Sequence, residues 1–293
     1  MSFFVDDEIA TQPNTWREAA ALAPRWAEHL IADGERVAFV GCGTSWFMAQ
    51  VLASWRESRG HGESDAFSAS EFQRRPYDHV VAITRSGTTT EVVDLLNELS
   101  GKTPTTVLLG TQDTLAAAAA DSVVDLSFAD EQSVVQTRFA TTALTLYRAA
   151  FGQDIERLAT AAEAAVSEPL APEWAAAEQV TFLGRGWTIG LAHEAALKYR
   201  ETSSSWAESY PAMDYRHGPI SIAAPGRLVW MFGTAPSGLR EEVLATGATF
   251  VESDRDPVVE LVLAQRTAVA RARQLGLNPD RPQHLTRSIV LAG

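Results

Sequence analysis

The chain has 293 residues, a hydrophobic content of 46% and a formal net charge of −13. That length is enough for two domains of ordinary size, and the acidic balance argues against a nucleic-acid surface, which needs clustered lysine and arginine. The single cysteine, Cys42, excludes an intramolecular disulfide. The N-terminus lacks the basic start and apolar core of a signal peptide, and no apolar run approaches the ~20 residues of a membrane span. We therefore expect a soluble cytoplasmic protein with neither nucleic-acid nor membrane partners.

The first half of the chain alternates short apolar runs with segments of helical spacing. Residues 15–31 have alanine, leucine and tryptophan at helical spacing, with Pro24 as a candidate kink and Gly34 as the stop. Further strands are expected at 36–40, 66–68, 80–83, 105–109 and 123–126, and further helices after 45, at 114–120 and at 139–151. Strands and helices that alternate at such short intervals predict an α/β fold with a parallel, doubly wound sheet.

One strand–turn–helix unit of this half has an unusual composition. The run at 80–83 is followed by the turn Thr84-Arg85-Ser86-Gly87-Thr88-Thr89-Thr90, where five of the seven residues carry a hydroxyl. Free N–H groups and the dipole of a helix N-terminus favour an anion, Gly87 allows a close backbone approach, and Arg85 could add charge. Simple helix capping is the alternative, but a cap needs only one hydroxyl. The turn therefore predicts a phosphate site, and a nucleotide is not the default ligand because no Gly-Lys-Ser/Thr follows.

The second half begins after a helix at 155–166 and a proline-containing linker at 167–172. Its first strand, 179–183, leads into Gly-Arg-Gly-Trp-Thr at 184–188, as the strand at 36–40 leads into Gly-Cys-Gly-Thr-Ser at 41–45. This repeat predicts two copies of one α/β unit, with domains at 1–152 and 153–293. Neither turn completes the GxGxxG pattern of dinucleotide sites. We also expect a strand at 227–232, helices at 237–246 and 264–275, and a tail at 279–293 that wraps over another part of the chain.

The helix after Gly186 carries an acid–base strip. Glu194, Lys198 and Glu201 fall on one narrow face, and leucines border that face on both sides. A solvated Glu–Lys pair is the alternative, but the apolar borders favour a pocket, where burial moves carboxylate pKa values toward neutrality. His217, in Tyr-Arg-His-Gly-Pro at 215–219, follows this helix after a short connection and could exchange a proton near neutral pH.

Seven motifs in this order resemble the SIS (sugar isomerase) family, in particular the isomerase half of glucosamine-6-phosphate synthase and the AgaS-like and type II glucosamine-6-phosphate deaminase-like proteins. The motifs are GCGTS at 41–45, TRSGTTTE at 84–91, EQSVVQTRF at 131–139, FLGRG at 182–186, HEAALKYRETS at 193–203, the ES-Y-MDYRHGP pattern at 208–219 and HLTRSIV at 284–290. The resemblance implies two flavodoxin-like SIS domains, a homodimer, and a sugar 6-phosphate held in the turn of the first domain.

The resemblance also implies roles for individual residues. Glu201 matches the proton-shuttling carboxylate of the family, His217 its ring-opening histidine and Lys198 the lysine on the same helix. The expected substrate contacts are Thr84, Ser86 and Thr89 to the phosphate, with Arg85, Gly87 and Thr88 in the same turn; Thr44 and Ser45 to the sugar; and the backbone of Val134 and Val135, with Glu131 beside them. No cofactor is expected, and no metal site, because the histidines at 193 and 217 lack ligand spacing with a second His or Cys.

Two features depart from the synthase pattern. Arg287 stands where the synthase has a lysine, and an arginine cannot form an imine with an open-chain sugar, although it could pair with a carboxylate or with the substrate. The chain also has no cysteine nucleophile at its start, so glutamine-dependent synthesis is not expected of it.

Three functions are compatible with these observations. The first is an enzyme that moves a proton between C1 and C2 of an amino-sugar or ketose 6-phosphate, as an isomerase or a deaminase. The second is a deglycase acting on adducts such as fructosamine 6-phosphates. The third is a sensor that binds a sugar phosphate without converting it. Fold alone does not decide among them, but Glu201 and His217 favour an enzyme.

Overall fold

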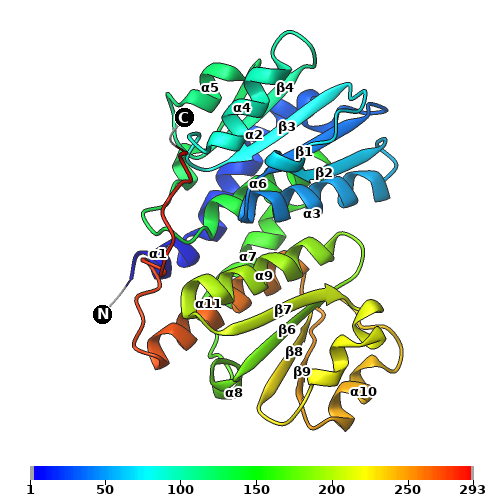
Figure 1. Cartoon of the computed structure of the whole chain (residues 1–293), viewed down its shortest axis with the longest axis vertical. Coiled ribbons are helices and arrows are strands. Elements are labelled where there is room, and N and C mark those ends of the chain that lie inside the picture. Colours follow the sequence, from blue (N-terminus) through cyan, green and yellow to red (C-terminus); the bar gives the residue numbers. More distant parts are fainter. Residues whose placement is uncertain (1–2, 292–293) are drawn as a thin grey trace.

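Two parallel β-sheets enclose a layer of helices in the computed structural model, which describes residues 3–291 (Figure 1). The predicted α/β class is therefore confirmed, with two separate parallel sheets. Among residues 3–291, no helix combines the length and the apolar composition needed to cross a bilayer.

The first sheet has five strands in the order β2-β1-β3-β4-β5. They are β1 (Val37–Gly41), β2 (Ser64–Ser68), β3 (His79–Thr84), β4 (Thr105–Leu109) and β5 (Ser122–Asp125). Strands β1 and β4 are buried along their whole length, which explains their nearly continuous apolar sequence. The chain order reverses between β1 and β3, so the turns that leave these two strands flank the crevice where open α/β sheets bind ligands.

The second sheet has four strands in the order β7-β6-β8-β9, which repeats the first four positions of the first sheet. They are β6 (Gln179–Gly184), β7 (Trp206–Pro211), β8 (Arg227–Met231) and β9 (Thr249–Val251). The sequence predicted β6 and β8 but neither β7 nor β9. Both of these are edge strands, and β7 is only partly buried while β9 has three residues, so neither has the apolar run of a central strand.

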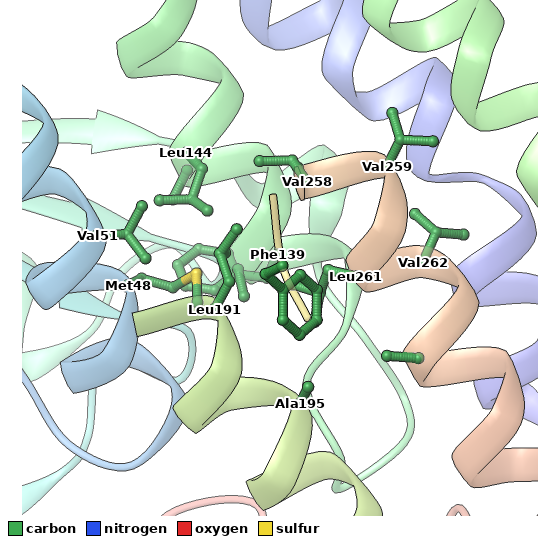
Figure 2. Close-up of a cluster of buried hydrophobic side chains, with 14 of the residues drawn as sticks. Met48, Val51, Phe139, Leu144, Leu191, Ala195, Val258, Val259, Leu261 and Val262 are labelled. Atoms are coloured by element: carbon green, nitrogen blue, oxygen red, sulfur yellow. The ribbon is translucent and has the colours of Figure 1, made fainter. Parts of the chain in front are cut away.

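The middle layer consists of helices that pack against both sheets. They are α2 (Gln12–Ile31), α3 (Thr44–Ser58), α6 (Arg138–Ala150), α7 (Ile155–Ser167), α9 (Thr188–Ser203) and α11 (Pro257–Gln274). Their shared core includes Met48, Leu144, Leu191 and Val258 (Figure 2). A Cβ on Gly190 would lie 2.7 Å from the carbonyl oxygen of Phe47, so this glycine lets α9 cross α3 at close range.

The outer faces of the sheets have smaller cores of their own. Helices α4 (Thr90–Leu99) and α5 (Leu115–Ala119) cover the first sheet, and α10 (Leu239–Ala245) with the short turns Asp214–His217 and Pro219–Ile222 covers the second. Residues of one strand alternate between the two sides: Val37 and Phe39 contribute to the shared core, Ala38 and Val40 to the outer one. This arrangement is compatible with the predicted tandem doubly wound units.

Several helix boundaries differ from the sequence-based expectation. Helix α11 begins at Pro257, seven residues before the expected start, because Asp256 caps it through the Val258 N–H and its first turns are apolar enough to be buried on all sides. Pro24 lies inside α2, which continues to Ile31. The short helices α1 (Phe4–Ala10) and α8 (Pro172–Ala176) were not predicted.

The C-terminal tail, residues 278–291, contains neither helix nor strand and lies across other parts of the chain, as expected. It leaves α11, passes beside α1 and ends over the first sheet near α4 and α5 (Figure 1). The tail and the N-terminal helix therefore both reach the predicted substrate side of the molecule.

Candidate active site

The hydroxyl-rich turn joins β3 to α4 at the crevice of the first sheet. Gly87 has a φ of +65°, and a Cβ there would lie 2.1 Å from the Thr114 hydroxyl, so conformation and space both require glycine. The Gly87 N–H donates to the hydroxyl of the buried Thr84 at 3.3 Å. The turn is thus a tight backbone structure, and its other hydroxyls belong to Ser86, Thr88, Thr89 and Thr90.

Three of those hydroxyls converge on one oxygen of the tail. The Oγ of Ser288 lies 3.1 Å from the hydroxyl of Ser86, 3.0 Å from that of Thr88 and 3.4 Å from that of Thr89. Thr89 is the N-cap residue of α4 but makes no side-chain capping bond. The hydroxyls therefore form a convergent polar set, as a phosphate site needs, instead of capping the helix.

Backbone contacts hold the tail over this turn. The N–H of Thr90 donates to the carbonyl of Ile289 at 3.2 Å, and the N–H of Leu291 donates to the Thr90 hydroxyl at 2.9 Å. A phosphate bound among these hydroxyls would meet Ser288, so the tail is part of the candidate site.

Arg85 is hydrogen-bonded to loop 131–135, which carries the predicted sugar-lining residues. Its buried guanidinium donates to the carbonyls of Ser133 at 2.9 Å and Val134 at 3.0 Å, and lies 3.5 Å from the carboxylate of Glu131. Val135 is buried, and its N–H donates to the Ser133 hydroxyl. The contacts of Arg85 are therefore with loop 131–135 and with the tail, where it donates to the carbonyl of Arg287 at 3.4 Å, and direct contact with a phosphate stays a prediction.

Only one of the two carboxylate oxygens of Glu131 accepts hydrogen bonds from the described residues. One oxygen accepts from the N–H and hydroxyl of Thr137, at 2.6 and 2.8 Å, and from the N–H of Arg138 at 2.9 Å. The other oxygen is buried and has no hydrogen-bond partner among the described residues. Arg287 donates to the carbonyl of Glu131 and pairs with the carboxylate of Asp130. Arg287, at the position where the resemblance implies a lysine, is thus engaged with the carboxylate of Asp130, next to this loop.

In the acid–base strip of α9, Glu194 and Lys198 are buried and Glu201 is partly exposed, unlike a solvated surface pair. The Lys198 ammonium lies 2.5 Å from the carboxylate of Glu201 and 3.6 Å from that of Glu194. Burial raises the pKa of Glu194 to about 8, although Lys198 opposes this shift. Burial would lower the pKa of Lys198, but the two carboxylates outweigh it and the pKa is raised. With its pKa near 8, Glu194 is expected to retain its proton near neutral pH.

The turn after β1 contacts this strip from the other half of the chain. The Thr44 hydroxyl donates to Glu194 at 3.3 Å, and both Thr44 and Ser45 are buried. A Cβ on Gly41 would lie 2.6 Å from the Ser45 backbone, so glycine permits this sharp entry into α3. Glu131 also contributes to the raised pKa of Lys198, which places loop 131–135 within electrostatic reach of the strip.

His217 is outside the hydrogen bonds and ion pairs that join these groups. It ends the short turn Asp214–His217, is exposed, and its side chain makes no hydrogen bond or ion pair with any residue in the described part of the chain. Gly218, with a φ of +144°, follows it. The ring-opening role of His217 stays a prediction, since no contact joins it to Glu201 or Lys198.

Sequence reasoning did not assign three residues that the structure adds to this region. Ser288 lies inside the HLTRSIV motif, but nothing local links it to the turn at 84–90. Asp280 and Glu8 contact loop 131–135 from the two chain ends. A helical pattern in Val5, Glu8 and Ile9, all buried, was the available signal for α1.

Comparisons with known proteins identify the first half. Residues 30–152 match the family model described as the SIS domain. These residues belong to the SIS domain family. The match includes both glycine turns of the first sheet and loop 131–135, so the phosphate-turn candidate lies within the SIS domain.

Similarity to known proteins extends beyond the SIS domain over nearly the whole chain. The chain is 28% identical to glutamine–fructose-6-phosphate aminotransferase (isomerizing) of Idiomarina loihiensis over 97% of its length, and 26% identical to that of Methanothermobacter thermautotrophicus over 98%. It covers 55% and 57% of those proteins, and so spans about half the length of these relatives.

Solved structures show the same fold. The glucosamine-6-phosphate deaminase of Thermotoga maritima matches with a TM-score of 0.81 and 25% identity, covering 98% of this chain and 99% of that one. The tagatose-6-phosphate ketose/aldose isomerase of Escherichia coli matches with a TM-score of 0.75 at 19% identity, covering 95% of each chain, which establishes likeness of fold alone.

Proposed function

We propose that this protein is a phosphosugar isomerase or amino-sugar-6-phosphate deaminase that moves a proton between C1 and C2 of its substrate. The observation that carries the proposal is the acid–base strip on α9, where the buried Lys198 lies 2.5 Å from the partly exposed Glu201 and 3.6 Å from the buried Glu194. A carboxylate and a lysine buried together are expensive to desolvate, which favours a chemical role over a purely structural one.

The phosphate of the substrate would bind at the turn between β3 and α4. Ser86, Thr88 and Thr89 supply hydroxyls that already converge on a single oxygen, and the N-terminus of the ten-residue helix α4 adds its dipole. Ser288 would move aside or join the phosphate shell. This geometry suits a small dianion on a flexible arm, such as a sugar 6-phosphate.

Proton transfer would then be carried by Glu201. After the ring opens, its carboxylate takes the proton from one of the two adjacent carbons, giving an enediol or enolamine, and returns it to the other carbon. One base suffices because both positions lie on neighbouring carbons. Lys198 holds the carboxylate in place, and Glu194 keeps the strip near neutral charge by retaining its own proton.

Ring opening is assigned to His217 in this proposal, and Arg287 has no imine-forming role because a guanidinium stays protonated. The paired Asp130–Arg287 contact supports a positioning role for Arg287 at loop 131–135. The relatives whose names specify reactions of fructose 6-phosphate, glucosamine 6-phosphate and tagatose 6-phosphate support the class of substrate.

The proposal includes a homodimer in the cytoplasm, a domain boundary between residues 152 and 153, and amino-sugar metabolism as the context. Neither a cofactor nor a metal ion is needed for this proton transfer. A dimer would appear as twice the chain mass by light scattering at micromolar concentration.

A panel of hexose and hexosamine 6-phosphates, with fructosamine 6-phosphates added, tests the function. Ketose formation without ammonia indicates an isomerase, ammonia release a deaminase, and amine release from the adducts a deglycase. Solvent deuterium incorporation at C1 or C2 reports the proton transfer itself. Binding without turnover or exchange across the whole panel would contradict the proposal and favour a sensor.

A further inference from the structure

Glu8 connects the N-terminal helix to the loop that lines the candidate sugar site. One oxygen of its carboxylate accepts the N–H of Gln132 at 2.6 Å and the N–H of Ser133 at 3.1 Å. The residue is 3% exposed, and its other oxygen is buried without a hydrogen-bond partner among the described residues. A surface helix has no need to place a carboxylate there, so the contact itself requires an explanation.

Asp280 of the tail reaches the same loop. Its side chain accepts the N–H groups of Phe4 and Val5, each at 2.9 Å, and so satisfies the free N-terminus of α1. Its backbone carbonyl accepts the N–H of Val134 at 3.1 Å. The helix that carries Glu8 is therefore anchored by the residue that also bonds the loop.

Together these contacts engage nearly every backbone polar group in the middle of the loop. The N–H groups of residues 132 and 133 bond Glu8, that of Val134 bonds Asp280, and the carbonyls of residues 133 and 134 bond Arg85. Because these hydrogen bonds involve the backbone, they fix the conformation of the loop, and so the surface that it forms, independently of its side chains. Glu131, whose second oxygen accepts no hydrogen bond from the described residues and lies 3.5 Å from the Arg85 guanidinium, lies at the start of this surface.

The placement of Glu8 is energetically unfavourable for an isolated carboxylate. Burial, with a further contribution from Glu131, raises its pKa to about 7, and the two N–H groups and Arg138 only partly offset this. The charged guanidinium of Arg85 also interacts with it. A carboxylate that stays buried at such a cost is expected to have a role, here to hold the loop to which it is hydrogen-bonded.

We propose that Glu8 is a positioning residue for loop 131–135, and that it fixes the backbone of this loop for the sugar with Asp280 from the opposite end of the chain. The inference rests on the proposed function, because it takes the loop as the sugar-lining wall. It assigns the N-terminal helix a role in substrate recognition, although α1 lies outside the residues that match the SIS domain.

The test compares Glu8→Ala, Glu8→Gln and Asp7→Ala in the full chain. Alanine removes the acceptor, glutamine keeps a neutral acceptor oxygen of the same reach, and Asp7 is an exposed neighbour on the same helix. Amide hydrogen exchange at residues 132 and 133 reports the anchoring without any ligand. KM and kcat for an accepted sugar 6-phosphate report the consequence for function.

We expect Glu8→Ala to accelerate exchange at both amides by about tenfold or more and to raise KM about tenfold, with a smaller change in kcat. Glu8→Gln should restore both towards the parent values, and Asp7→Ala should change neither. Parental exchange rates in Glu8→Ala, or faster exchange with an unchanged KM, would overturn the proposal. A parent protein that binds no sugar phosphate would overturn the proposed function instead, and the exchange rates alone would then decide whether Glu8 anchors the loop.

Discussion

The two sheets begin with the same strand–glycine–helix turn but use it differently. A Cβ on Gly41 would lie 2.6 Å from the backbone of Ser45, and one on Gly184 would lie 2.4 Å from the backbone of Thr188, so both turns enter their helices at similarly close range. The Thr188 hydroxyl accepts the Arg185 N–H at 2.8 Å and contacts the Phe232 carbonyl at 3.0 Å, both within its own half. The first turn instead directs Thr44 across the molecule to the acid–base strip.

The second pair of turns, after β3 and after β8, differs more strongly. The turn after β3 presents three hydroxyls to one oxygen of the tail. In the turn after β8, the N–H of Ala235 already donates to the carboxylate of Glu252 at 2.7 Å. A resident carboxylate repels a phosphate, so among the described residues the turn after β3 is the better candidate for an anion site. A repeated fold thus provides two crevices, and their side-chain chemistry favours one of them for the proposed phosphate site.

The largest expected effect is on turnover and concerns the acid–base strip of α9, which the first half contacts through Thr44. Glu201→Gln keeps the shape of the side chain but cannot accept a proton, so turnover of an accepted sugar phosphate should fall by ~10² to 10⁴. Ligand affinity should change little, because the proposed phosphate contacts lie on the other sheet. The measurement is kcat together with solvent deuterium incorporation, and exchange at the parental rate would move the base elsewhere, with Glu131 the next candidate.

A paired experiment tests the difference between the two turns. Ser86→Ala with Thr89→Ala should weaken sugar 6-phosphate binding, since each lost hydrogen bond to a charged group is worth about 1.5–3 kcal/mol. The matched control in the second half is Thr234→Ala with Ser237→Ala, which removes two exposed hydroxyls after β8. Calorimetric titration should show a large loss for the first pair alone; equal losses would contradict the assignment of the anion site to one half.

The burial of Glu194 should make stability depend on pH. The raised pKa of Glu194 means that the folded chain holds a proton between pH ~4.5 and ~8 that the unfolded chain releases. Its contribution is therefore fully present below pH ~4.5 and is lost as the pH rises to ~8, at up to about 1.4 kcal/mol per pKa unit.

Glu194→Gln should remove this part of the pH dependence. Urea unfolding at pH 5 and pH 8 should show a smaller decrease in the free energy of unfolding for the variant than for the parent. The pKa of Glu8 is also raised, but Glu8 is present in both proteins, so its effect on stability cancels in the comparison. An unchanged difference between the two pH values would indicate that Glu194 is ionised in the folded protein.

The smallest expected effect concerns the tail. Ser288→Ala removes the hydroxyl that occupies the convergence point of Ser86, Thr88 and Thr89, at a typical net value of about 0.5–1.5 kcal/mol for a neutral hydrogen bond. If phosphate displaces this hydroxyl, affinity for a sugar 6-phosphate should rise by about two- to tenfold. A fall in affinity of that size would instead show that Ser288 belongs to the phosphate shell.

The sequence by itself determined the elements and the local chemistry of this protein. Buried parallel strands require apolar β-branched runs, tight strand–helix turns require glycine, and a shared helical face needs only the spacing of Glu194, Lys198 and Glu201. Each of these constraints acts between residues that are close together in the sequence, so each produces a local sequence pattern. The edge strands β7 and β9 were missed because a partly exposed or three-residue strand satisfies no such pattern.

Only the tertiary structure decided which of these groups meet. Ser288 lies 202 positions from Ser86, Thr44 lies 150 from Glu194, and Glu8 lies 124 from Gln132. Each contact depends on the packing of helices against two sheets and on the course of both chain ends, which no local pattern records. The residue types thus predict the chemistry of the site. Which residues come together depends on tertiary packing and burial, which the spacing of residues along the sequence does not predict.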